Sequence, residues 1–269
     1  MSLQSPLKLI AVLSFVWILS LLIQGVWLVL VVTNLNSGPG IPWSVPVMGL
    51  LLWMLWMYLR HAGSQRNIVI RSGLRANRVP IRTFLLAILA GLLSIFALIG
   101  LWILLVDVFG AEANVPDFSK YPVLTSTTVV IMAALVGALV EESGMRGYFQ
   151  GRLEASLSGP LAVLLTSIAM IPAHMITQGF RLTTLIFYLC VDVMLGTMAY
   201  LTNSILPGIV VHAIGLIIFF TVIWPGFGQR GNTYQDQTTY LYLASAIACA
   251  ILAMMCFRWL AKCRDATAR

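Results

Sequence analysis

Charged residues are scarce in this sequence. Aspartate, glutamate, lysine and arginine together make up 9% of its 269 residues, whereas 60% of the residues are hydrophobic. Soluble domains are about one quarter charged. A composition this poor in charge excludes an ordinary water-soluble domain and indicates a protein that folds in the lipid bilayer.

Cysteines are also few, and their spacing excludes two kinds of framework. Cys190, Cys249, Cys256 and Cys263 fall in or beside apolar segments and form no CxxC pair. A disulfide scaffold or a zinc module needs closely and regularly spaced cysteines. We therefore interpret all four as small buried apolar residues.

Long apolar runs, by contrast, occur along the whole chain. A helix needs about 20 mainly apolar residues to cross the hydrocarbon core. Eight segments meet this need, at 8–33, 41–59, 82–109, 123–155, 158–178, 182–201, 205–224 and 239–261. The sequence thus predicts an all-α polytopic membrane bundle of about eight transmembrane helices, with the first segment retained as a helix rather than cleaved as a signal peptide.

The net charge of +7 reflects membrane topology rather than a nucleic-acid partner. If the N-terminus is cytoplasmic, 13 of the 16 lysines and arginines lie on the cytoplasmic side, and only Lys120, Arg181 and Arg230 lie outside. This split agrees with the positive-inside rule for an even number of spans, with both termini in the cytoplasm. The basic connector at 61–80 is interpreted as a solvated loop, the alternative being an interfacial segment on the anionic leaflet.

Ionisable residues inside the predicted spans are candidates for a functional site, because burying them in a membrane is costly. The set comprises Glu141, Glu142, Arg146, His174, Asp192 and His212. On a helix Glu142 and Arg146 share a face and can pair. Glu141 points about 100° away from that face, so its carboxylate is left unpaired and available for chemistry. The alternative is that both glutamates form a purely structural ion-pair cluster with Arg146.

The turn around Ser158 predicts that these residues meet. It makes an antiparallel hairpin of two spans, with Glu142 sixteen residues before the pivot and His174 sixteen residues after it. His212 follows roughly 10 Å into a later span. Two histidines and a glutamate could bind a metal through Glu141, His174 and His212, or position a water that Glu141 deprotonates. Both arrangements indicate hydrolysis of an acyl bond.

The motifs around these residues resemble those of the CPBP family of intramembrane proteases, which includes the CAAX prenyl endopeptidase and bacterial Abi and bacteriocin-immunity relatives. The segment EESGMRGYF at 141–149 matches the family's EExxxR motif with its following glycine and aromatic residues. His174 matches the second motif, with Met170 in place of the usual phenylalanine. His212 matches the last motif, but Leu216 stands where the family has asparagine or aspartate, and Asp192 where it often has glycine.

The resemblance implies a role for each motif residue. Glu141 would be the general base, supported by Glu142 and Arg146, while His174 would hold the water and His212 would stabilise the oxyanion. The cofactor stays open between zinc and a metal-free glutamate mechanism. The implied catalytic core is 123–224, between an N-terminal region at 1–122 and a C-terminal region at 225–269.

These observations predict an intramembrane endopeptidase in a bacterial cytoplasmic membrane, with the bilayer and a peptide or protein substrate as its partners. Two alternatives stay open. One is a catalytically inactive relative, a membrane scaffold or bacteriocin-immunity factor, for which Leu216 would record lost catalysis. The other is an ion-coupled transporter, which the lack of two symmetry-related halves argues against.

Overall fold

The computed structural model describes residues 6–60, 73–110, 118–223 and 237–267. Within these ranges the regular elements are all helices. The long apolar helices are α1 (Pro6–Ser37), α2 (Ser44–Arg60), α4 (Ile81–Phe109), α5 (Val123–Glu141), α7 (Gly159–Gln178), α8 (Leu182–Thr202), α9 (Leu206–Ile218) and α11 (Gln237–Thr267). Short elements are η1 (Phe118–Lys120), η2 (Glu142–Phe149), α6 (Gln150–Glu154) and η3 (Phe219–Ile223). The predicted all-α polytopic bundle is confirmed.

Seven helical spans in the described ranges are long and apolar enough to cross a membrane. α5, η2 and α6 run on as one of them, Val123–Glu154. The eighth predicted span, 41–59, forms the shorter helix α2, which begins only at Ser44. The side chain of Asn34 explains this start, because it binds the carbonyls of Gly38 and Ile41 and the amide of Ser44 and so holds the preceding residues in a turn.

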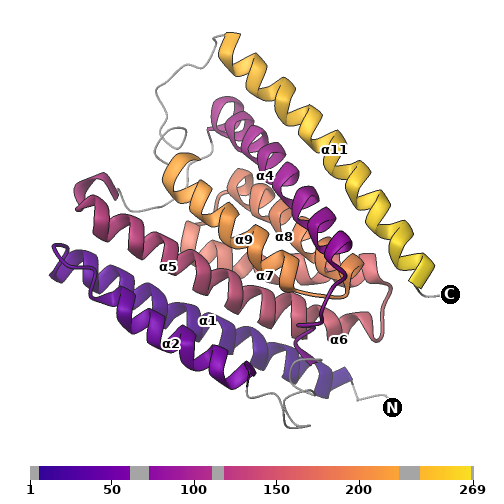
Figure 1. The fold of residues 1–269 in the computed structure, drawn as a ribbon, viewed down its shortest axis with the longest axis horizontal. Coiled ribbons are helices and arrows are strands. Elements are labelled where there is room, and N and C mark those ends of the chain that lie inside the picture. The colour runs from indigo at the N-terminus through magenta and orange to yellow at the C-terminus, as the bar shows by residue number, and fades with distance from the viewer. Residues whose placement is uncertain (1–5, 61–72, 111–117, 224–236, 268–269) are drawn as a thin grey trace.

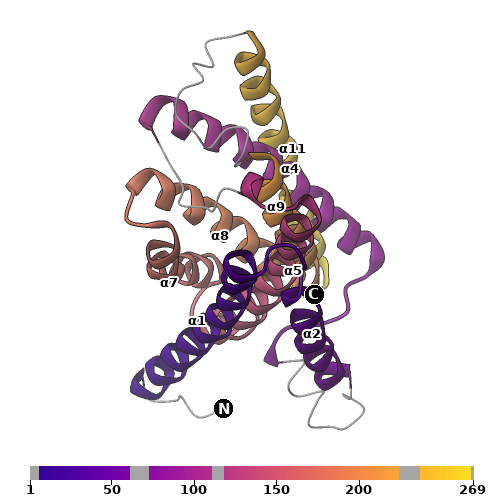
Figure 2. The same cartoon turned by 90° about the vertical axis from the view of Figure 1, so that its left-hand side faces the viewer.

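The helices lie side by side in one bundle (Figure 1). α11 packs along α4 at the edge away from α1, as Figures 1 and 2 both show. α7 packs against α8, and α5 packs against both α1 and α9. α1 begins and α11 ends at the same end of the bundle, which agrees with an even number of crossings if the shorter helix α2 is counted with the seven longer spans. This end also holds the α6–α7 and α8–α9 connections.

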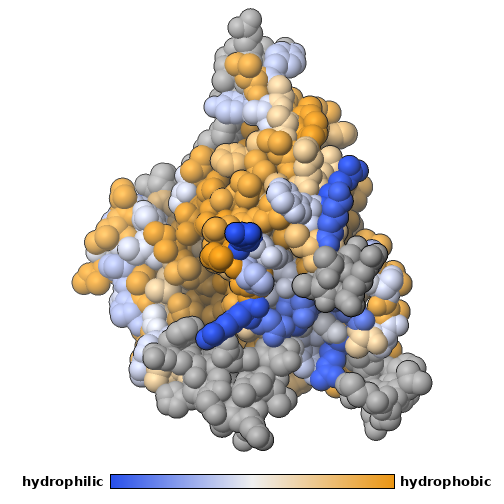
Figure 3. All heavy atoms as spheres, turned by 45° about the vertical axis from the view of Figure 1, so that its right-hand side comes forward, coloured by the Kyte–Doolittle hydropathy of each residue, from blue (hydrophilic) through white to orange (hydrophobic). Residues whose placement is uncertain are grey.

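The outside of the bundle is apolar, as a lipid-facing surface should be. Large hydrophobic side chains such as Phe15, Val123 and Trp259 are more than half exposed. Figure 3 shows apolar side chains spread widely over one face, with the strongly hydrophilic ones in its middle and lower parts. The four cysteines form no disulfide, and the prediction that all are buried is wrong, because α8 exposes Cys190 while Cys249, Cys256 and Cys263 on α11 are half-buried. Lipid can cover a thiol there as well as protein can.

The predicted basic connector is only partly described. Its residues 61–72 lie outside the described residues, as do residues 224–236, which contain Arg230. The connector resumes at residue 73 and leads into α4. There the expectation of a solvated loop is wrong for Arg75, which is buried among the helix ends, whereas Arg78 is exposed.

A π-helical segment interrupts the span that carries the first motif. Residues 142–149 form η2, between α5 and α6. Such segments are rare and frequent at functional sites. The widened turn brings Gly147 so close to the preceding connector that a Cβ at this position would overlap the backbone carbonyl of Leu74.

We expect Gly147→Ala to destabilise the protein by about 1–3 kcal/mol, the usual cost of overpacking a well-packed contact. The clash is with backbone, which cannot rotate away as a side chain can. Thermal unfolding of the detergent-solubilised protein measures the effect. Gly49→Ala is the matched control, because its added methyl meets only Met132 Cε at 3.8 Å; equal unfolding temperatures for the two variants would contradict the prediction.

Candidate active site

The two adjacent glutamates of the first motif differ sharply in exposure. Glu142 is completely buried, whereas the side chain of Glu141 is 17% exposed. Glu141 ends α5 and Glu142 begins η2, so their side chains leave the helix in different directions. Of the two, Glu141 lines the cavity of about 780 Å³ between the helices and Glu142 does not. It is therefore the glutamate placed to contact a water or a substrate.

His212 on α9 lies between these two carboxylates. Its Nδ1 is 3.0 Å from Glu142 Oε1, and its Nε2 is 3.7 Å from Glu141 Oε2. A carboxylate can only accept, so Nδ1 carries the proton in the hydrogen bond with Glu142. Glu142 therefore fixes the orientation of the imidazole, and Nε2 faces Glu141.

A second linked group joins Arg146, Asp192 and His174. Arg146 Nη2 pairs with Asp192 Oδ1, and His174 Nε2 hydrogen-bonds to Asp192 Oδ2 at 3.0 Å. Asp192 is almost fully buried on α8. One carboxylate therefore balances the buried charge of Arg146 and orients the imidazole of His174.

The predicted pair of Glu142 and Arg146 is confirmed, with Glu142 Oε1 3.7 Å from Arg146 Nη1. Arg146 also lies 4.0 Å from Glu141 Oε2. Its closest carboxylate, however, is that of Asp192. Because α8 packs directly against α7, Asp192 is the carboxylate that binds His174. Because α5 packs against α9, His212 is the imidazole that binds Glu142 at the end of α5.

The four titratable side chains open onto one cavity of about 780 Å³. Glu141, His174, Asp192 and His212 all lie on its wall. Most of the remaining lining is apolar and comes from α1, α4, α5, α7, α8, α9 and η3. A site of this kind, largely apolar with a few convergent polar groups, is typical of a binding or catalytic pocket.

Tyr188 is a site residue that the sequence reasoning missed. Its ring stacks on the imidazole of His174, with centroids 4.3 Å apart and planes 12° from parallel. It lies one turn before Asp192 on α8 and lines the same cavity. Nothing in the local sequence marks a tyrosine within an apolar span as a neighbour of a histidine on another helix. Asp192 could be identified from the sequence, because burying the charge of an aspartate in a membrane span is costly. The sequence did not show which residues it pairs with.

Among the described residues, no group of three or more His, Cys, Asp and Glu side chains is arranged to hold a metal ion. Both ring nitrogens of His212 face glutamates, and Nε2 of His174 faces Asp192. The arrangement thus does not fit the predicted ligand set of Glu141, His174 and His212. Zinc binding stays a prediction, and no chemical step below passes through a metal.

One family model matches the part of the chain that carries this site. Residues 123–218 match the model described as type II CAAX prenyl endopeptidase Rce1-like. No curated protein and no solved structure matched the chain. The matched segment runs from the start of α5 to the end of α9 and contains Glu141, Glu142, Arg146, His174 and His212. The resemblance to the CAAX-type intramembrane proteases is therefore confirmed for these residues.

Proposed function

We propose, on the premise that residues 123–218 form an Rce1-like domain, that this protein is an intramembrane endopeptidase. The observation that carries the proposal is the contrast between the two glutamates. Glu141 lines an apolar cavity beside His174 and His212, while Glu142 is buried and holds His212. A general base must reach its proton, and a supporting carboxylate need not.

In the proposed reaction Glu141 takes one proton from a water held between it and His174. The water oxygen forms a bond to the carbonyl carbon of the scissile peptide, and the carbonyl π electrons move to the oxygen. Doubly protonated His212 keeps its Nδ1–H on Glu142 and turns its Nε2–H toward this oxyanion. The carbonyl then re-forms, the C–N bond breaks, and Glu141 gives its proton to the leaving nitrogen.

The surroundings of the site support a substrate with an apolar part next to the scissile bond. The cavity extends along α1 as far as Leu35 and reaches Ile223 of η3, and apart from Gln24 the side chains of these two walls are apolar. A transmembrane segment or a lipid-modified peptide would bury its apolar surface there. The family description names a prenylated CAAX substrate, which is one substrate of this kind. By the positive-inside rule, the end of the bundle that carries Arg75 and Arg152 would face the cytoplasm.

The catalytically inactive alternative rests on Leu216. This leucine lies on the cavity wall one turn after His212, and its side chain offers no hydrogen bond to an oxyanion. A protein of this kind would keep the buried ion pairs for stability and cleave nothing. The experiment below separates the two functions.

We expect the purified protein in lipid nanodiscs to cleave peptides extracted from membranes, giving new termini that mass spectrometry identifies. We also expect the rate to be unchanged by a metal chelator, because no group of three His, Cys, Asp and Glu side chains among the described residues is arranged to hold a metal ion. A rate lost with the chelator and restored by zinc would establish the metal mechanism instead. If no new peptide terminus appears when the protein is present, the result would support the catalytically inactive alternative.

A further inference from the structure

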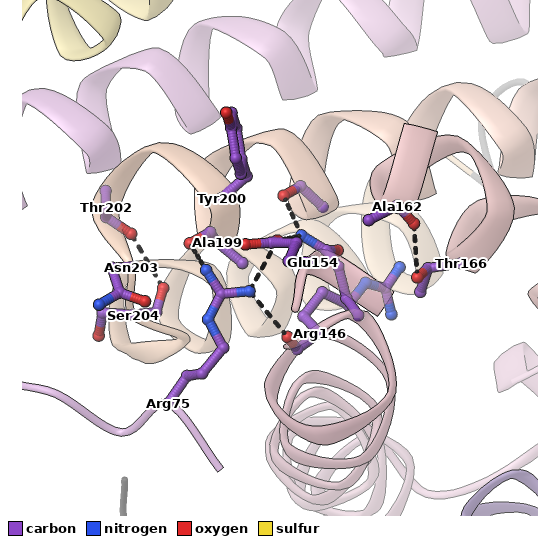
Figure 4. A network of polar contacts seen from close by, with 12 residues as sticks. Arg75, Arg146, Glu154, Ala162, Thr166, Ala199, Tyr200, Thr202, Asn203 and Ser204 are labelled. Carbon is purple, nitrogen blue, oxygen red and sulfur yellow. Dashed lines mark hydrogen bonds and ion pairs between the residues drawn. The ribbon is translucent and has the colours of Figure 1, made fainter. Parts of the chain in front are cut away.

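Arg75 lies outside the matched domain, yet its side chain is buried among the helices of the site. It belongs to the segment that leads into α4, and only 6% of it is exposed. A buried guanidinium needs several acceptors to replace the water it has lost. Arg75 finds them on three elements of the domain, as Figure 4 shows.

The guanidinium joins α8, α6 and η2. Its Nη2 donates to the carbonyl of Ala199 at 2.8 Å, and its Nη1 donates to Glu154 Oε1 at 2.9 Å and, more weakly, to the carbonyl of Arg146 at 3.5 Å. Arginine holds its donors in a rigid planar fork, so these contacts fix the spacing of the groups that accept them.

Gln150 extends the same connection. Its Nε2 donates to Glu154 Oε1 at 2.8 Å and to the carbonyl of Gly196 on α8 at 2.9 Å. Gly196 is one turn after Asp192, and Gln150 is one turn after Arg146. The contacts of Arg75 and Gln150 thus hold η2 and α6 against α8 within a turn or two of the Arg146–Asp192 ion pair.

The backbone of the segment is shaped to bring Arg75 there. Arg75 and Asn203 are the non-glycine residues with positive φ in the described ranges, at 54° and 48°. The amide of Ile205 donates to the carbonyl of Arg75 at 3.0 Å, and Asn77 Nδ2 donates to the carbonyl of Asn203 at 2.9 Å. Such uncommon conformations persist only where the surroundings hold them in place.

We propose that Arg75 is a positioning residue for the reaction, and this inference rests on the proposed function. By setting the distance between η2 and α8 it keeps Arg146 and Asp192 in contact, and through Asp192 it keeps His174 directed into the cavity. Arg75 is not among the residues that line the cavity, so it acts on the reaction through other residues. Its effect is on the geometry of the catalytic residues.

The test is Arg75→Lys, which keeps the charge and removes the fork. We expect kcat to fall by about 10- to 100-fold, as a small displacement of catalytic groups does, with KM within about twofold of the wild-type value. Arg78→Lys is the matched control, because Arg78 is three residues further along the same segment and exposed. A kcat for Arg75→Lys equal to that of Arg78→Lys would overturn the proposal.

Hydrogen–deuterium exchange tests the same inference without any activity. In Arg75→Lys we expect faster exchange in peptides that cover 142–154 and unchanged exchange in α11. Equal acceleration in both regions would show a general loss of stability and overturn the positioning role. If the wild type cleaves no peptide but Arg75→Lys shows the local change in exchange, the proposed function fails. The contacts by which Arg75 holds η2 and α6 against α8 are then still supported.

Discussion

Glu141→Gln is expected to lower kcat for peptide cleavage by about 10²- to 10⁴-fold, the usual contribution of a general base. Glutamine has nearly the shape of glutamate but cannot take a proton from water. Glu141 is partly exposed on the cavity wall, and the buried Arg146 beside it keeps its ion pairs with Glu142 and Asp192, so the substitution leaves no buried charge without a partner. We therefore expect the thermal unfolding temperature to stay close to that of the wild type.

Glu142→Gln is the informative comparison for this variant. Its amide oxygen can still accept the Nδ1–H of His212, so the orientation of the imidazole is kept, and we expect a loss within about tenfold. Cleavage assays of both variants with one peptide measure the difference. A larger loss of kcat for Glu142→Gln than for Glu141→Gln would show that Glu142, and not Glu141, is the general base. Equal amounts of product from the wild type and Glu141→Gln would contradict the protease proposal.

Asp192→Asn is expected to reduce both activity and stability. The carboxylate of Asp192 accepts from Arg146 with one oxygen and from His174 with the other. Asparagine offers a single acceptor oxygen, so one of these buried donors would face an NH₂ group. Leaving a buried group unsatisfied costs about 1–3 kcal/mol. We also expect kcat to fall by about 10- to 100-fold, because His174 loses its fixed direction.

The matched control is Asp107→Asn on α4, where the aspartate is exposed. We expect this variant to cleave and unfold as the wild type does. Unfolding temperatures and kcat of the two variants, measured in the same nanodiscs, give the comparison. Wild-type kcat in Asp192→Asn would show that His174 does not need this carboxylate, whatever the change in stability.

The fold class followed from the sequence because the hydrocarbon core imposes one condition on every span. Long apolar runs must be helical in lipid, where each backbone amide needs a partner within its own helix. The runs at 82–109 and 182–201 correspond closely to α4 and α8. α2 was predicted too long, because apolar residues near Ile41 read as part of a span while Asn34 holds them in a turn. The π-helical form of η2 was also missed, since its sequence is compatible with an α-helix.

The sequence identified the ionisable residues that lie together in the bundle, but not Tyr188 and not the pairing among them. The cost of an ionisable group in a membrane identified Glu141, Glu142, Arg146, His174, Asp192 and His212 from the sequence alone. Neighbours on one helix could be paired by periodicity, as for Glu142 and Arg146. Neighbours on different helices could not, because helix rotation and depth depend on how the whole bundle packs.

The sequence by itself therefore determined a helical membrane protein and which of its residues are too costly to be buried without a role. Only the tertiary structure decided that His212 binds Glu142, that Asp192 joins Arg146 to His174, and that Arg75 is buried beside them. The physical reason is that the burial cost belongs to a residue type, whereas the partner that offsets this cost is set by the packing of distant segments.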